Sequence, residues 1–180
     1  EILSVTLEDN ATFTLSANHG VLAGELSVLS QVVNTDYTVT FDGSLSATDA
    51  ALLVPYVARL DGVNTLDVFG TASEIGGQLN DLQTLSGKVS QIRVTDVDAT
   101  SHVAAVTVTF EQVGTVDAQG TAWDALALLV NDSSTSGDEA PRLVVTGVDA
   151  ANAAAVANEE VGVAQVTGVT GGNLATINTA

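Results

Sequence analysis

Polar and apolar residues alternate in several short runs of the chain. Residues 37–41 read Tyr-Thr-Val-Thr-Phe, and 65–69 and 106–110 show related patterns. Alternation with a period of two predicts strands that have one buried and one solvent-facing side. We therefore expect strands at 12–16, 37–41, 65–69, 89–95, 103–110 and 143–146.

Segments with helical spacing follow these runs. Apolar residues at three- and four-residue steps predict an amphipathic helix at 18–33. A second helix is expected from Ser46, and Pro55 should kink it or delay its start. In the third, at 73–87, we expect Ile75, Leu79 and Leu82 to share one core with Ile92 and Val94 of the next strand. Its Gly76-Gly77 pair weakens the helix and indicates close approach of a neighbouring segment.

The strand-then-helix unit recurs along the chain, at 37–60 and again at 64–85, and its opening reappears at 91 and 142. Such recurrence is typical of scaffolds built from stacked repeats. The predicted fold is α/β, with strand–helix repeats that form a mostly parallel sheet or solenoid with helices on one side. We expect a single repeat-built domain over 1–180, with a looser C-terminal part from about residue 131.

The remaining segments give weaker patterns. Helices are expected at 117–129 and 149–159, with a polar loop at 131–141 between them. Strand-like runs near both ends, at 2–7 and after Gly171, predict sheet edges that another copy of the chain could extend.

Charge restricts the partners. The chain has 22 acidic residues against four bases, and its formal net charge is −18. Phosphate contacts need clustered cations, so a nucleic acid and an anionic membrane surface are both disfavoured as partners. No apolar run reaches the length of a membrane span, so we expect no membrane insertion. Cysteine is absent, which excludes disulfides and thiolate chemistry.

Catalytic patterns are also lacking. His19 and His102, the two histidines, stand in unrelated segments, and no nucleophile-elbow sequence is present. We therefore expect a protein that is not an enzyme.

Calcium is the cofactor that the sequence favours, and no other is indicated. Asp96 and Asp98 stand two residues apart at the end of a predicted strand, and Asp67 belongs to the preceding unit. Calcium binds six to eight oxygens, which carboxylates and turn carbonyls supply. The predicted ligands are therefore Asp96, Asp98 and Asp67. The alternative is that these aspartates cap helices and form Asx-turns.

The segment 66–96 carries a resemblance. Its matching positions are Gly70, Thr71, Ala72, Ile75, Leu79, Leu82, Val89, Ile92, Val94, Thr95 and Asp96. In these positions it resembles repeats of very long secreted bacterial surface proteins, of the adhesin, surface-layer and RTX-associated kind. The resemblance implies an extracellular or cell-surface location. The glycine-rich calcium nonapeptide of RTX proteins is absent.

Two functions follow as hypotheses. The first is a non-catalytic extracellular structural protein: a self-assembling surface-layer, matrix or filament subunit, or an adhesin segment, whose partners are copies of itself. The alternative is a calcium-dependent module that binds carbohydrate or a cell surface.

Overall fold

The computed structural model describes residues 10–33, 36–62, 65–97, 104–114, 124–132, 142–147 and 163–166, together with Ser4 and Thr6. The strands are β1 (Ala11–Ser16), β2 (Tyr37–Asp42), β3 (Ser44–Ser46), β4 (Leu66–Gly70), β5 (Val89–Val94), β6 (Val106–Thr109), β7 (Leu129–Asn131), β8 (Leu143–Thr146) and β9 (Val163–Val166). The α-helices are α1 (His19–Leu29), α2 (Ala47–Ala51), α3 (Ala72–Thr84), α4 (Phe110–Gly114) and α5 (Asp124–Ala127), and Val54–Arg59 forms the 3-10 helix η1.

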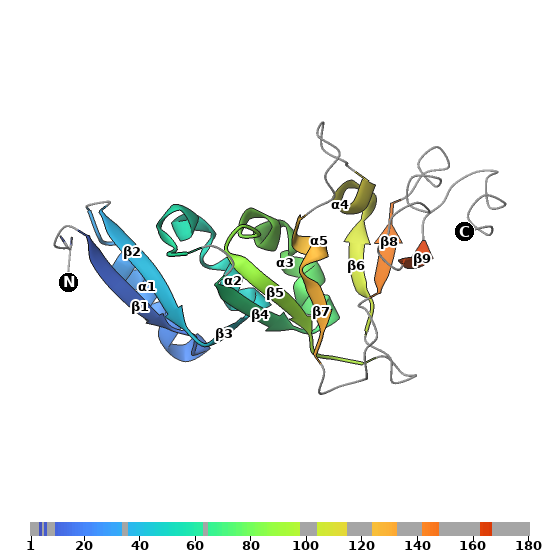
Figure 1. The fold of residues 1–180 in the computed structure, drawn as a ribbon, viewed down its shortest axis with the longest axis horizontal. Coiled ribbons are helices and arrows are strands. Elements are labelled where there is room, and N and C mark those ends of the chain that lie inside the picture. The colour runs from blue at the N-terminus through green and yellow to red at the C-terminus, as the bar shows by residue number, and fades with distance from the viewer. Residues whose placement is uncertain are drawn as a thin grey trace.

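The strands form three sheets, with the orders β1-β2, β3-β4-β5-β7 and β6-β8-β9. Every pairing between these strands is parallel. The sheets follow one another along the long axis of the molecule, with β1 at one end and β9 towards the other (Figure 1). The predicted α/β class with parallel strands is therefore confirmed. No helix in the described part of the chain is long and apolar enough to cross a membrane.

The first two sheets are joined at Gly43. Strands β2 and β3 are consecutive in the chain, but β2 pairs with β1 and β3 pairs with β4. Gly43, between them, has a φ of 107°, which is unfavourable for residues with a Cβ atom. Gly43 is thus the point at which one extended segment passes from one sheet to the next.

Two strand–helix–strand units share one packing pattern. Helix α1 buries Leu22, Leu26 and Leu29, and 53 positions later α3 buries Ile75, Leu79 and Leu82. This spacing places three apolar residues on one face of each helix. Ile92 and Val94 of β5 are fully buried in the same core, as predicted. The apolar layer is continuous from Leu15 in β1 to Val145 in β8.

Helix α3 starts at a capping box. The Thr71 hydroxyl accepts a hydrogen bond from the Glu74 N–H, and the Glu74 carboxylate accepts one from the Thr71 N–H at 2.8 Å. This exchange satisfies backbone donors that a helix start leaves open. On its second face α3 packs on β6. A Cβ atom at Gly76 would lie 2.9 Å from the Thr107 carbonyl oxygen, so the predicted close approach is confirmed at Gly76.

Some predicted boundaries were wrong. The helix expected at 117–129 ends earlier, because Leu129 and Val130 form strand β7 and pair with Ile92 and Arg93. Phe110 starts α4 and does not end a strand. Pro55 stands at the beginning of η1, where its missing N–H costs nothing. The runs expected at 2–7, 149–159 and after Gly171 lie outside the described residues, apart from Ser4 and Thr6, and so do residues 133–141 of the loop expected at 131–141. Asn131, the first residue of that predicted loop, belongs to β7.

Candidate functional site

A ladder of polar side chains crosses the solvent side of the central sheet. The Arg93 guanidinium on β5 contacts both carboxylate oxygens of Asp67 on β4, each at 3.1 Å. Ser44 on β3 donates to Asp67 at 2.8 Å, and Asp132 after β7 accepts from Arg93 at 3.3 Å. One side chain from each strand or its end thus joins a network that spans the whole sheet. A bidentate contact of this kind fixes the relative orientation of the two side chains and also pairs their charges.

The polar ladder shifts the pKa values of two of its members, Asp67 and Arg93. Burial alone would raise the pKa of the Asp67 carboxyl. Hydrogen bonds from Arg93, Ser44 and Gln91, together with the Arg93 charge, outweigh that effect and hold this pKa below its ordinary value of 3.8. The hydrogen bond to Asp67 raises the pKa of Arg93. Both groups are therefore charged at neutral pH, and Asp67 is occupied by protein partners.

The structure separates two of the predicted calcium ligands. In the β4–β5 register Asp67 lies opposite Gln91, and Asp96 lies five residues further along the β5 direction. At the rise of a strand this separation is ~16 Å, too far for both carboxylates to bind one ion. Asp98 lies outside the described residues. Among the described residues no group of three or more His, Cys, Asp or Glu side chains is arranged to hold a metal.

Asp96 lies just beyond the end of β5, as expected. Its carboxylate accepts a hydrogen bond of 2.7 Å from the backbone N–H of Ala72, the first residue of α3. A carboxylate at this place satisfies an open donor and interacts favourably with the positive end of the helix. At Asp96 the structure therefore shows the capping role that was weighed as the alternative. Calcium binding by Asp96 and Asp98 stays a prediction.

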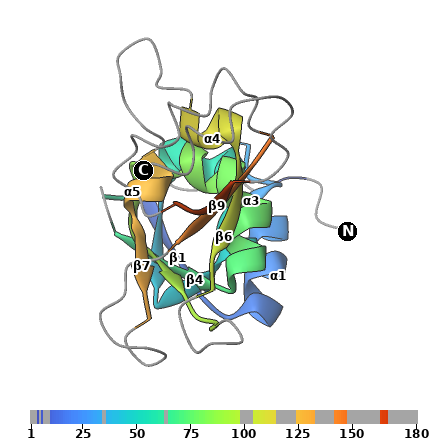
Figure 2. The ribbon, with the colours of Figure 1, turned by 90° about the vertical axis from the view of Figure 1, so that its right-hand side faces the viewer.

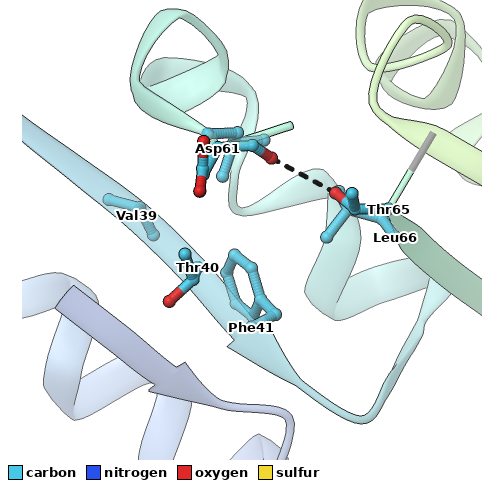
Figure 3. A pocket seen from close by; sticks show the side chains of 7 residues that line it. Val39, Thr40, Phe41, Asp61, Thr65 and Leu66 are labelled. Carbon is cyan, nitrogen blue, oxygen red and sulfur yellow. Dashed lines mark hydrogen bonds between the residues drawn. The ribbon is translucent and has the colours of Figure 1, made fainter. Parts of the chain in front are cut away.

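A small notch opens between β2 and β4, beyond the end of η1 (Figure 3). It encloses about 190 Å³ and is lined by Val39, Thr40, Phe41, Leu60, Asp61, Thr65 and Leu66. The Asp61 N–H donates to the Val39 carbonyl at 2.8 Å, and the Thr65 hydroxyl donates to the Asp61 carbonyl at 3.2 Å. The notch is lined by one carboxylate, that of Asp61, and by no basic side chain.

The first sheet has an outer edge on the side of β1 that faces away from β2. Val39 accepts from the Asp61 N–H, so its carbonyl points away from β1. The neighbouring Thr40 therefore faces β1, and its hydroxyl donates to the Phe13 carbonyl at 3.3 Å. Because peptide groups alternate along a strand, the N–H and C=O groups of Thr12 and Thr14 point outward from this edge.

One further hydrogen bond supports the outward orientation of the Thr12 and Thr14 peptide groups. The Ser16 N–H, at the end of the same edge, donates to the Glu25 carboxylate at 2.9 Å and not to β2. In the described part of the chain no strand pairs with the outer edge of β1. The edge carries no charged residue and no proline, which are the usual protections against pairing with another chain.

Sequence reasoning missed the Asp67–Arg93 ladder. The signal was present, because both residues occupy polar positions of alternating strands in adjacent units. Only the register shows that Arg93 reaches diagonally back to Asp67, since its direct partner is Phe69. No protein-family model, curated protein or solved structure matches the chain.

Proposed function

We propose that this chain is a non-catalytic structural segment that assembles with copies of itself through the edges of its parallel sheets. The observation that carries the proposal is the outer edge of β1 at one end of the molecule (Figure 1). No described strand pairs with this edge, and its own residues are uncharged, although the Glu25 carboxylate binds the Ser16 N–H at its end. Such an edge is a template for strand addition. Towards the other end, β7 and β9 each have a single strand neighbour in the described part of the chain.

The direction of the strands determines the kind of assembly. Because all described pairings are parallel and the first two sheets follow chain order, a strand added outside β1 continues the same series. Contact between unlike ends of two copies is heterologous, and a heterologous contact that does not close gives an open filament.

Composition supports an extracellular or cell-surface setting. Salt outside the cell screens the repulsion of a chain with net charge −18, and this screening favours assembly. The resemblance of 66–96 to repeats of secreted bacterial surface proteins agrees with that location.

The alternative, a calcium-dependent module that binds carbohydrate, has less support. Sugar sites usually present an aromatic ring, but Tyr37 is buried, with Arg59 over its ring at 4.9 Å. The Tyr56 hydroxyl donates to the Leu26 carbonyl. Trp123 lies outside the described residues. Calorimetric titration of the chelated protein with calcium, followed by a glycan array, tests this module: heat and a glycan hit would favour it over assembly.

Sedimentation velocity and negative-stain microscopy test the assembly. Purified protein is compared at rising concentration in low salt, in NaCl, and in NaCl with calcium. We expect linear particles whose length increases with concentration, most strongly in NaCl. A protein that remains monomeric at millimolar concentration under all three conditions would contradict the proposed function.

A further inference from the structure

A side chain of α1 occupies the end of the β1 edge. The Ser16 N–H donates to the Glu25 carboxylate at 2.9 Å. Glu25 is half-buried and is the single acidic residue of α1. Further along the edge the backbone groups of Thr12 and Thr14 point outward, and no described strand pairs with them. The last outward-facing N–H of β1 is therefore used within the chain.

Helix α3 and strand β4 provide an internal comparison for this contact. The two units align with a shift of 53 positions, because α1 and α3 start 53 residues apart. Figure 2 shows the two helices on the same side of β1 and β4. With this shift Phe69 corresponds to Ser16, and Gln78 corresponds to Glu25. The structure therefore contains the same backbone position once at an outer edge and once inside a sheet.

Inside the central sheet, a neighbouring strand stands at the equivalent place. The Gly70 carbonyl accepts from the Thr95 N–H just after β5, so Gly70 faces β5 and the preceding Phe69 faces β3. In the β3–β4 register Phe69 lies opposite Ser46, and its backbone therefore belongs to the ladder between these strands. The helix residue of this unit carries no charge. At β1, where no described strand precedes, the helix instead carries Glu25, and its carboxylate accepts from the strand N–H.

We propose that Glu25 is a stop for strand addition at the β1 edge. Its carboxylate takes the place of the carbonyl that a preceding strand would supply to the Ser16 N–H, and pairing is limited to Thr12 and Thr14. An ionised carboxylate has only acceptor atoms, so it satisfies this N–H and repels the carbonyl oxygen of a strand that approaches it. Glu25 has this role where the edge accepts a strand, so the role rests on the proposed function and determines where pairing ends.

Such a stop fixes the register of the added strand. The solvent side of β1 carries the hydroxyl side chains of Thr12, Thr14 and Ser16, and a shift by two residues brings one hydroxyl to the place of another. These side chains therefore specify the register weakly. A strand that slides towards the end of β1 must displace Glu25 from an N–H that it already satisfies, and this cost opposes the shift.

Glu25→Ala tests the stop, and Asp81→Ala on α3 is the matched control, because each variant removes one negative charge from a helix. Sedimentation velocity in NaCl measures the association constant, and circular dichroism and the melting temperature show that the fold is retained. We expect Glu25→Ala to associate about fivefold more tightly than Asp81→Ala, since one more backbone N–H is open to pairing. Hydrogen exchange of the Ser16 amide should be slowed by assembly in Glu25→Ala, and should be slow before and after assembly in the natural protein.

Glu25→Gln separates the hydrogen bond from the charge. Its amide oxygen can still accept from the Ser16 N–H, so we expect this variant to associate like Asp81→Asn. Equal association of Glu25→Ala and Asp81→Ala would overturn the proposal. So would a Ser16 amide that still exchanges rapidly in assembled Glu25→Ala, or a Glu25→Gln variant that associates as tightly as Glu25→Ala.

The same measurements separate the stop from the proposed function. A natural protein that assembles, with no gain in Glu25→Ala, would retain the proposed function and reject the stop. A natural protein that stays monomeric while Glu25→Ala assembles would reject the proposed function and retain Glu25 as the residue that closes the edge. If both proteins stay monomeric, the stop and the proposed function are both rejected.

Discussion

Arg93, Lys88 and Arg59 each form specific contacts in this acidic chain. Arg93 joins Asp67 and Asp132 across the central sheet. The Lys88 ammonium donates to the carbonyls of Leu60 and Gly62 at 2.7 and 2.9 Å, and it holds the segment after η1 against β5. Arg59 lies over Tyr37. Each of these three side chains therefore joins two elements of the fold.

Asp67→Asn tests the polar ladder. The substitution keeps the shape of the side chain but removes the charge that Arg93, Ser44 and Gln91 contact. We expect a loss of about 1–2 kcal/mol in the free energy of unfolding at pH 7. Asp81→Asn, which removes one charge from α3, is the control and should change it by less than about 0.5 kcal/mol.

The free energy of unfolding that Asp67→Asn loses should become smaller as the pH falls. The folded-state pKa of Asp67 lies below its ordinary value of 3.8. The carboxylate therefore stabilises the fold above the unfolded-state pKa, and this contribution disappears as the pH falls through the folded-state pKa. Urea unfolding of the natural protein and of Asp67→Asn is measured between about pH 7 and about pH 2. The free energies of unfolding of the two proteins should converge in acid. A constant difference over this range would show that the ionisation of Asp67 does not account for the stability lost in Asp67→Asn.

At the scale of elements, α3 is enclosed on two faces. Its apolar face packs on the central sheet, and Gly76 lets the backbone of β6 approach the other face. This packing requires glycine at 76 but not at 77, although the two residues are neighbours in one helix.

Gly76→Ala and Gly77→Ala should therefore change stability in opposite directions. Alanine is the better helix former, and at Gly77 its methyl group meets nothing within 4 Å, so we expect a gain of about 0.5–1 kcal/mol. At Gly76 the same methyl group would lie 2.9 Å from the Thr107 carbonyl, and the required shift of β6 should make the variant less stable than the natural protein. Thermal or urea unfolding of Gly76→Ala, Gly77→Ala and the natural protein measures both changes in stability. A stabilising Gly76→Ala would show that β6 does not press on α3.

Local patterns predicted the elements whose neighbours lie close in the sequence. The helical spacing of Ile75, Leu79 and Leu82 identified α3, and these residues are fully buried. The same reasoning failed at Leu129, because Leu126, Leu129 and Val130 also fit helical spacing. Strand β7 forms there because its backbone completes the edge of β5, more than 30 residues earlier, and a local window does not contain this information.

The division into three sheets was also not predictable. The turn signal at Asp42-Gly43 was visible, but a turn between two strands usually reverses the chain. Here the chain continues in the same direction, and the positive φ of Gly43 moves it to another sheet. Asp67 and Asp96 were expected to meet at one edge, whereas the register within the central sheet places them far apart along the strands.

At the scale of the whole molecule, repulsion between acidic groups opposes folding as well as assembly. The formal net charge is −18, and most pairs of charges therefore repel each other. Because salt screens charges beyond ~10 Å at 0.1 M, the melting temperature should rise as NaCl increases. Differential scanning calorimetry at constant pH measures it, at a protein concentration low enough to keep the chain monomeric. A melting temperature that is constant or falls would show that the acidic groups are already neutralised.

The central claim is that the outer edge of β1 pairs with another copy, and a substitution at Thr12 tests it most directly. Thr12→Pro removes an N–H group that points outward, and edge strands tolerate proline at such positions. Thr12→Val retains the N–H group and the branched side chain, so it is the matched control. We expect Thr12→Val to assemble like the natural protein in sedimentation velocity, and Thr12→Pro to stay monomeric with a similar melting temperature. Assembly of Thr12→Pro to the same extent as Thr12→Val would contradict the account.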